Sequence, residues 1–349
     1  MKRFIIAIVV LCTLLPIAAI GCLQGGSGGV VNVHNWGEFI DESVLRIFEK
    51  ETGIKVNYST YETNEQLYSL MRRGGANIDV IIPSDYMIAR MIEEGMLAEL
   101  DFSNIPNFSL IDERYKGLGY DPDDKYSVAY MTGTVGLIYN SAKITDDISS
   151  WGALFDESYS GQILMFDNPR DAFGIALKHL GFSLNTTSEA EIYEAFNLLA
   201  HQKPFLQAYV MDQIFDKLES GEAWIGPYYA GDFLTMHENN PDLRFVRPSE
   251  GTNFFVDAMC IPADAQNKEN AEVFINFMTR TDIAIMNMEY VMYASANFEA
   301  AEEFKDELSA EDYAIMFASS DVLAKSEIYY HLPRNILELY DELWVELKR

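Results

Sequence analysis

The chain has 349 residues, of which 49 % are hydrophobic, 23 % are charged and 13 % are aromatic. This length and apolar content predict a large core divided over two domains or lobes, and they argue against a disordered chain. Asp and Glu number 54 against 25 Lys and Arg, which gives a net charge of −29. So many carboxylates would repel phosphate backbones and anionic lipid, so we expect no nucleic-acid partner and consider a cation instead.

The N-terminus has the three parts of a secretory signal. Lys2 and Arg3 precede an apolar run over 4–20, which Pro16 interrupts. The small and apolar residues ahead of Cys22 resemble a bacterial lipobox, with Ala19 where Leu is usual. We therefore predict a signal peptide over 1–21, lipidation of Cys22 and a flexible Gly-rich tether over 22–29. An uncleaved signal anchor is the alternative, and either form would hold the folded part outside the cytoplasm on a bacterial membrane.

The three cysteines predict no disulfide within the mature chain. Cys12 would leave with the signal and Cys22 would carry lipid. Cys260 lies in an apolar stretch, which predicts a buried and inert thiol.

The first part of the folded chain alternates strands and helices. Thr63 and Gln66 have the spacing of a helix capping box, and Ser84 is placed to cap the helix that follows it. The order βαβαβα predicts a mainly parallel sheet covered by helices. The predicted strands are 30–36, 54–58 and 79–83, and the predicted helices are 41–52, the segment after Thr63, and 84–94.

A second α/β region follows from about Gly133. Its pattern again predicts strands separated by helices, and the C-terminal third is helical. Two α/β lobes with a cleft between them are the natural architecture, and ligands of such sheets lie at the carboxyl ends of strands. The predicted strands are 163–166, 224–229 and 254–261, and the predicted helices are 170–180, those starting at Ser188 and Asp232, 267–278 and 335–347.

Motifs for catalysis or cofactors are missing from the sequence. There is no phosphate-binding glycine loop or dinucleotide fingerprint, and His237 is followed four residues later by Pro241, which cannot bind zinc. The five histidines show no metal-ligand spacing. We therefore expect no enzyme activity, no cofactor and no bound metal.

Aromatic residues instead meet acids or hydroxyl groups at the predicted strand ends. Aromatic faces attract cations and pack on methylene chains, at roughly 0.5–2 kcal/mol per contact, and a desolvated carboxylate fixes an ammonium group. Together they suit a long aliphatic chain with ammonium ends. The segments are 35–39, 83–86, 166–171, 228–232 and 254–257.

Residues 31 to about 300 resemble the substrate-binding lipoproteins of bacterial spermidine/putrescine ABC transporters. The resemblance is carried by several motifs in order: Asn35–Phe39, Glu51–Val56, Ser59–Glu65, Pro83–Tyr86, Phe254–Asp257 and Ile261–Glu269. It implies a type II periplasmic-binding-protein fold, in which two α/β lobes joined by hinge strands close on the ligand. The lobes would be 30–132 plus 257–300 and 133–256 plus 301–349. The protein would be a monomer that delivers polyamine to a membrane permease.

The resemblance also implies the roles of individual residues. Asp257 would hold one ammonium group and Asp171 the other, with Glu38 and Ser84 assisting. Phe39, Asn168, Tyr229 and Phe255 depart from residues common in the family, and Asn168 removes a carboxylate that some members have there, so putrescine and spermidine both stay open as ligands. The aromatic wall would be Trp36, Tyr86, Tyr229, Phe255 and Tyr293, with one further polar contact from within Glu327–Tyr329. Phe39 would also contact the ligand, without the hydroxyl group of the Tyr that is common in the family at this position.

Functions of other classes compete with this interpretation. Tyr228 and Tyr229 form a tyrosine pair of the kind found in ferric-iron-binding proteins of similar architecture. Adjacent strand residues point to opposite faces, however, so only one of the two would reach the cleft. A hydrolase would need a nucleophile and base, which the sequence does not offer, and an adhesion module would not need a deep cleft.

Overall fold

The computed structural model describes residues 28–74 and 76–349. The predicted signal peptide, Cys22 and the tether as far as residue 27 lie outside the described residues. No helix in the described part of the chain combines the length and apolar character needed to cross a bilayer.

The N-terminal elements follow the predicted order. Asp41 caps α1 by accepting a hydrogen bond from the Ser43 amide, and Gly53 ends the helix with a φ of 74°. Thr63 caps α2 by accepting from the Gln66 amide at 3.1 Å. Strand β1 pairs in parallel with β2 and with β3. The elements are β1 (Val30–Trp36), α1 (Glu42–Thr52), β2 (Lys55–Tyr61), α2 (Asn64–Arg73), β3 (Val80–Ile81) and α3 (Asp85–Glu93).

The predicted parallel pairing is confirmed for β1, β2 and β3, whereas the sheet as a whole is mixed because later strands join it in the antiparallel sense. Strand β4 (Ser127–Asn140), which no sequence pattern predicted, pairs antiparallel with β7 (Ile225–Tyr229), β8 (Leu243–Val246), β9 (Phe254–Cys260) and β10 (Ala294–Ser295). Nearly every residue of β4 is buried, so it lacks the alternation that marks a half-exposed strand. The strand order is β2-β1-β3-β9-β4-β7-β5-β6, with β8 and β10 also paired to β4.

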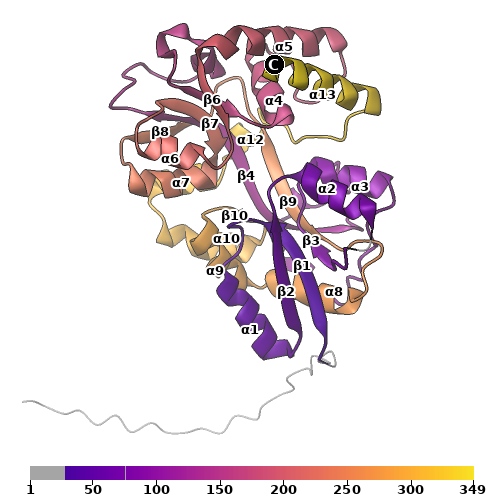
Figure 1. Ribbon diagram of the computed structural model, residues 1–349. Helices are drawn as coiled ribbons and strands as arrows, with labels where there is room; N and C mark the ends of the chain where they lie inside the picture. The colour runs from indigo at the N-terminus through magenta and orange to yellow at the C-terminus, as the bar shows by residue number, and fades with distance from the viewer. Residues whose placement is uncertain (1–27, 75) are drawn as a thin grey trace, which may run out of the picture.

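Strands β4 and β9 connect two groups of elements (Figure 1). From Ser127 to Thr134, β4 pairs with β9, and from Val135 onward it pairs with β7. The second group of elements holds the parallel strands β5 (Ile163–Phe166), β6 (Leu206–Val210) and β7. Its helices are α4 (Pro169–His179), α5 (Glu189–Gln202), α6 (Ile214–Glu219) and α7 (Ala230–Asn239).

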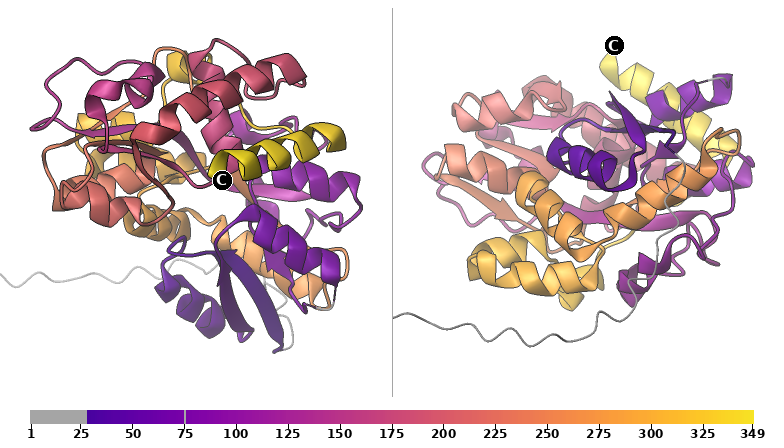
Figure 2. Two further views of the ribbon diagram at one scale, coloured as in Figure 1. Left: turned by 45° about the horizontal axis from the view of Figure 1, so that its top comes forward. Right: turned by 90° about the horizontal axis from the view of Figure 1, so that it is seen from below.

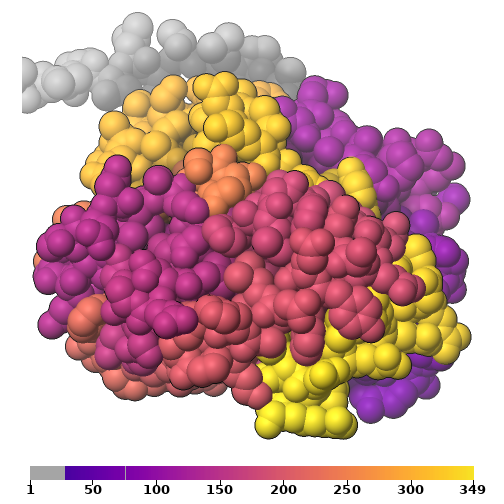
Figure 3. Space-filling view, turned by 90° about the horizontal axis from the view of Figure 1, so that it is seen from above, coloured from indigo at the N-terminus to yellow at the C-terminus, as the bar shows by residue number. Residues whose placement is uncertain are grey.

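The C-terminal helices pack on both groups of elements. Helix α13 (Arg334–Lys348) packs on α4 and α5, as the yellow and rose surfaces of Figure 3 illustrate. Helix α8 (Lys268–Met278) packs on β1, and α9 (Thr281–Val291) on α1, beside the indigo elements in both views of Figure 2. The remaining helices are α10 (Phe298–Phe304), α11 (Ala310–Met316) and α12 (Ser320–Leu323), with 3₁₀ turns at Pro106–Leu110, Glu113–Tyr115, Trp151–Phe155, Glu157–Tyr159, Lys203–Phe205 and Lys305–Glu307.

The buried side chains form a core that continues through the connecting strands. Val128, Met131 and Val135 of β4 are almost completely buried, as are Val256 and Met259 of β9. Cys260 is a free, buried cysteine, as predicted. Apolar packing of this kind fixes β7 and β9, which carry the predicted site residues Tyr229, Phe255 and Asp257.

Candidate functional site

Asp257 of β9 lies buried against the segment that leads into α3. Its side chain is 5 % exposed, and its Oδ1 accepts a 2.6 Å hydrogen bond from the Ser84 hydroxyl. Burial raises the pKa of Asp257 to about 7, although the Ser84 hydrogen bond acts in the opposite direction. Ser84 makes no side-chain cap on α3, so the predicted capping role is wrong. The Ser84 hydroxyl instead donates its hydrogen bond to the Asp257 carboxylate.

Asp85, the first residue of α3, connects this helix to β9 through hydrogen bonds. Its carboxyl group is fully buried and accepts hydrogen bonds from the amides of Tyr86 at 2.7 Å and of Val256 at 3.2 Å. Burial raises the pKa of Asp85 well above its usual range. Ser84 and Asp257, which form an antiparallel bridge, are therefore held in register by the contact next to them.

Asp171 lies in the first turn of α4 and is the second buried acid of the predicted site. Its Oδ2 accepts hydrogen bonds from Asn168 Nδ2 at 3.0 Å and from the Tyr229 hydroxyl at 3.3 Å. Burial raises its pKa to about 6, while hydrogen bonds from Tyr329 and Tyr229 and the charge of Arg170 lower it. Asn168 also caps α4. Its side chain therefore hydrogen-bonds both to the start of this helix and to the Asp171 carboxylate.

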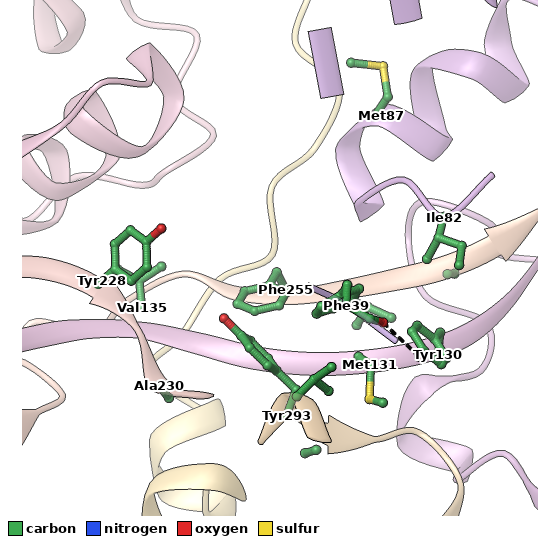
Figure 4. Close-up of a cluster of buried hydrophobic side chains, with 14 of the residues drawn as sticks. Phe39, Ile82, Met87, Tyr130, Met131, Val135, Tyr228, Ala230, Phe255 and Tyr293 are labelled. Atoms are coloured by element: carbon green, nitrogen blue, oxygen red, sulfur yellow. Dashed lines mark hydrogen bonds between the residues drawn. The ribbon is translucent and has the colours of Figure 1, made fainter. Parts of the chain in front are cut away.

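Four of the predicted aromatic residues form a continuous row of ring contacts. The Tyr229 and Phe255 centroids are 5.5 Å apart, those of Phe255 and Tyr293 are 6.1 Å apart, and those of Tyr293 and Phe39 are 5.4 Å apart. Figure 4 shows the last three rings gathered along β4 and β9, with the Tyr130 hydroxyl donating to the Phe39 carbonyl. The row joins the strand ends of both element groups.

Trp36 lies at the end of β1, with a partner that the sequence analysis missed. Its Nε1 donates to the Ile82 carbonyl at 2.8 Å, and the Tyr61 hydroxyl donates to the same carbonyl at 2.7 Å. The Trp36 and Tyr61 ring centroids are 4.6 Å apart. The charge of Asp257 contributes, after burial, to raising the Tyr61 pKa, which places this ring near the acid. Tyr61 belongs to the Ser59–Glu65 motif and is the last residue of a strand. These two features of the sequence could have identified it as a residue of the site.

Tyr86 is fixed by polar contacts from α2 and by a second missed tyrosine. Its hydroxyl accepts from Asn64 Nδ2 at 3.1 Å and donates to Glu65 Oε1 at 3.0 Å. The Tyr329 ring crosses it edge-on at 6.1 Å, and the Arg170 guanidinium lies 4.5 Å from the Tyr329 centroid. The expected polar contact from Glu327–Tyr329 is therefore best assigned to Tyr329, which faces Asp171.

Glu38 stands apart from the two acids. Its side chain is exposed and accepts a 3.0 Å hydrogen bond from the Tyr290 hydroxyl. Its backbone has a φ of 49°, a left-handed conformation at the turn after β1. The structure thus does not bring Glu38 into the cluster around Asp257 and Asp171.

Asp232 is a third acid of the region, which the predicted set of ligand contacts omitted. Helix α7 begins at Ala230 rather than at the predicted Asp232, which places Asp232 in the first helical turn. Its Oδ2 accepts a 2.7 Å hydrogen bond from the Tyr293 hydroxyl. Burial raises its pKa to about 7. The segment 228–232 already suggested an acid beside aromatic rings.

One electrostatic property, the presence or absence of an ion pair, is the same for Asp257, Asp171 and Asp232. Within residues 28–74 and 76–349, none of them forms an ion pair with Lys, Arg or His. Glu327, by contrast, pairs with Lys178 at 2.8 Å. A buried carboxylate without a cationic partner is costly, so these acids and the rings between them are suited to receive an organic cation.

A cavity of about 780 Å³ lies on the other face of the connecting strands. Thr132, Phe254 and Tyr115 line it, together with residues of α11 and α12. Because strand residues alternate between faces, Phe254 points away from the side that Phe255 and Asp257 share. This cavity is therefore distinct from the acid and aromatic cluster.

Two α/β groups joined by β4 and β9, with a cluster of acids and rings at the strand ends, define the class of two-lobed solute-binding proteins. Residues 43–317 match the family described as bacterial extracellular solute-binding protein, and the chain belongs to this family. Its place is therefore outside the cytoplasm.

Individual relatives show which proteins of this family the chain is similar to. The chain is 35 % identical over 279 residues to the spermidine/putrescine-binding periplasmic protein of Escherichia coli K12, covering 79 % of this chain and 80 % of that protein. It is 28 % identical to the putrescine-binding periplasmic protein SpuD of Pseudomonas aeruginosa, over 100 % of this chain and 99 % of that one. A solved putative spermidine/putrescine ABC transporter protein of Listeria monocytogenes is 38 % identical, with a TM-score of 0.85 over 91 % of this chain and 98 % of that chain. The predicted type II periplasmic-binding-protein fold is confirmed.

Proposed function

We propose that this protein captures a polyamine outside the cytoplasm and delivers it to an ABC permease. The observation that carries the proposal is the burial of Asp257 and Asp171 beside a row of aromatic rings, with no ion pair to either acid from the described residues. Similarity to proteins named for binding spermidine and putrescine supports the same ligand class.

Each predicted residue then has a role in binding. Asp257, oriented by Ser84, holds one ammonium group, and Asp171, oriented by Asn168, holds a second. Glu38 assists from the edge through its charge. The rings that surround the methylene chain and contribute cation–π attraction are those of Trp36, Phe39, Tyr86, Tyr229, Phe255 and Tyr293.

Binding is coupled to closure of two lobes, 30–132 plus 257–300 and 133–256 plus 301–349. The change of pairing along β4 between Thr134 and Val135 supports a hinge at this boundary. The packing of α13 on α4 and α5 supports its place in the second lobe. A ligand that contacts both lobes stabilises the closed form, which is the form that a permease recognises. The protein acts as a monomer without catalysis, anchored through a lipid on Cys22.

The ferric-iron alternative is not supported by the relatives, whose printed names refer to polyamines. The two tyrosines also have separate partners, since the Tyr228 hydroxyl donates to Asp212 at 3.0 Å and the Tyr229 hydroxyl to Asp171. Burial raises the pKa of both phenols, which disfavours the tyrosinate that iron would require.

Titration calorimetry with putrescine and spermidine tests the proposal. We expect saturable binding of at least one of them and a loss of roughly tenfold or more in affinity for Asp257→Ala, because an ammonium group then lacks its buried partner. The control is Asp264→Ala, which removes an exposed carboxylate a few residues along the chain. Absence of heat with both ligands, or equal affinity of Asp257→Ala and the control, would refute the proposal.

A further inference from the structure

Arg247, which directly follows β8, donates hydrogen bonds to two elements that lie far apart in the sequence. Its Nε donates to the Thr134 hydroxyl of β4 at 2.9 Å, and its Nη1 donates to the Ala314 carbonyl of α11, also at 2.9 Å. Its Nη2 donates to the neighbouring Ile315 carbonyl. Because α11 ends at Met316, both carbonyls lie in its last turn, where the helix supplies no further amide donors. One guanidinium group therefore connects β4 to the end of α11.

This guanidinium group is half-buried, and no ion pair of the described residues includes it. It lies 5.3 Å from the Phe245 ring centroid. Burial lowers the pKa of Arg247 to about 10, so the side chain is still charged at neutral pH. The hydroxyl, the two carbonyls and the ring thus replace part of the hydration that this cation has lost.

Thr134 marks the point where β4 changes its pairing partner. It is the last residue of β4 paired with β9, opposite Phe254, and Val135 is the first paired with β7. Paired residues of antiparallel strands share a face, so the Thr134 side chain lies on the same face as Phe254, which lines the cavity of about 780 Å³. Arg247 therefore acts on β4 from the face opposite the proposed ligand site and does not contact the polyamine.

Helix α11 belongs with the second group of elements, although the helix before it belongs with the first. Helix α11 packs on α7, whereas α10 packs on α9 and β10. The chain thus passes from one group to the other between these two helices, as it does in β4 and β9. Ala314 and Met316 line the same cavity as Glu113–Tyr115, so open space separates α11 from the first group. Arg247 holds α11 to β4 and hence to the second group.

We infer that Arg247 is a positioning residue for lobe closure, which ties Thr134 to α11 so that β4 bends on the Gly133 side of Thr134. The inference rests on the proposed closure of the lobes around a polyamine. Without the guanidinium group, α11 and β4 would move separately, and the ligand-free protein would occupy a wider range of open arrangements. A smaller population of the arrangement that binds lowers the apparent affinity by the same factor for every ligand of the site.

The test compares putrescine and spermidine affinities by calorimetry for the wild type, Arg247→Gln, Thr134→Val and the double variant. We expect Arg247→Gln to weaken binding of both ligands by the same factor, roughly three- to tenfold. Thr134→Val should weaken binding in the wild-type background and have no further effect in Arg247→Gln, because the hydrogen bond is already lost there. Removal of a positive charge would by itself attract a polyamine more strongly, so long-range electrostatics do not explain a loss of affinity.

Arg244→Gln is the matched control. Arg244 is exposed, and its side chain donates to the carbonyls of Pro241 and Leu243, each at 2.7 Å. This variant removes the same charge without breaking the connection to α11, so its affinities should equal those of the wild type. Small-angle X-ray scattering measures closure directly. We expect a larger ligand-free radius of gyration for Arg247→Gln than for the wild type and the same radius for both when polyamine is bound.

The outcomes separate this inference from the proposed function. Wild-type affinities in Arg247→Gln, or losses that differ between the two ligands, would overturn the inference while leaving the polyamine function in place. Failure of the wild type to bind either ligand would instead refute the function, and scattering from the ligand-free proteins would still test the hinge. Circular-dichroism melting establishes that each variant is folded. If Arg247→Gln does not fold, Thr134→Val carries the test, and wild-type affinities and radius in that variant would overturn the inference.

Discussion

The hydroxyl group of Ser84 donates a 2.6 Å hydrogen bond to the carboxylate of Asp257, which is 173 residues away in the sequence. Ser84 immediately precedes α3 in a position typical of a helix cap, yet it makes no such cap. The hydrogen bond favours the ionised form of an acid whose pKa burial raises to about 7. Ser84 therefore adjusts the charge of the site rather than the stability of the helix.

Ser84→Ala should weaken polyamine binding by roughly tenfold at pH 7, the size expected for a hydrogen bond to a charged group. Loss of the hydrogen bond raises the Asp257 pKa further, so more of the protein is protonated at this pH. The deficit should shrink at pH 8.5, where Asp257 is ionised in both proteins. Calorimetry at both pH values measures this difference.

A true cap provides the control for Ser84. Ser309 accepts a hydrogen bond from the Asp312 amide at 3.1 Å at the start of α11. Ser309→Ala should lower the free energy of unfolding by about 1 kcal/mol and leave polyamine affinity unchanged. A Ser84→Ala protein that loses stability but keeps its full affinity would contradict the role given to Ser84.

Polyamine affinity should rise with pH between about 5 and 8. Asp171 and Asp257 have pKa values raised to about 6 and about 7, and each must be ionised to pair with an ammonium group. Below its pKa, each acid reduces the affinity by up to roughly tenfold per pH unit. Binding near pH 6 should also release protons, visible as a calorimetric enthalpy that depends on the buffer. Flat affinity across this range would show that the acids titrate independently of the ligand.

The stability of the ligand-free protein should depend on pH in the opposite direction. An acid whose folded pKa exceeds its unfolded value keeps its proton in the folded state after the unfolded chain has lost it. The contribution of Asp257 to stability is therefore present below about pH 4 and is lost as the pH rises through its folded pKa of about 7. In denaturant titrations, Asp257→Asn should reduce the fall in stability between pH 5 and 8, because the amide does not titrate.

The residues of the site differ in how far the sequence could predict them. Trp36, Asp171, Tyr229 and Asp257 lie in or just after predicted strands, so periodicity and the family motifs place them together. Tyr329 lies in an irregular segment near the C-terminus, and only the fold brings it to Asp171. Long-range contacts of this kind have no local signal in the chain.

The strands that connect the two groups of elements show the same limit of prediction from the sequence. Strands β1, β2 and β5 have the apolar patterns and flanking helix signals that local rules detect. Strand β4 contains Gly133 and Gly136 among buried residues, and aromatic rings occupy the space that a side chain would need. A Cβ at Gly133 would lie 2.5 Å from the Phe255 ring. Glycines in such a strand reflect tertiary packing, which the sequence alone does not reveal.

Trp36 should report ligand binding through its fluorescence. It is half-buried beside Tyr61, and an ammonium or methylene group on its ring changes its environment. Polyamine titration should change the emission of the wild type, and most of this change should disappear in Trp36→Phe. Trp224→Phe is the control, since Trp224 lies just before β7 and outside the proposed site. Retention of the full signal in Trp36→Phe would place the ligand elsewhere.

Gly231→Ala should impair both stability and binding. The added methyl group would lie 2.5 Å from the Tyr293 ring and 2.7 Å from the Met292 carbonyl, so the ring or the start of α7 must move. Overpacking of this kind costs roughly 1–3 kcal/mol, and displacement of Tyr293 disturbs the aromatic row and the hydrogen bond to Asp232. Chemical denaturation and calorimetry measure the two effects. Gly37→Ala is the matched control for stability, because no atom lies within 4 Å of a Cβ at Gly37. Equal stability of the two variants would show that the Tyr293 contact tolerates a side chain at Gly231.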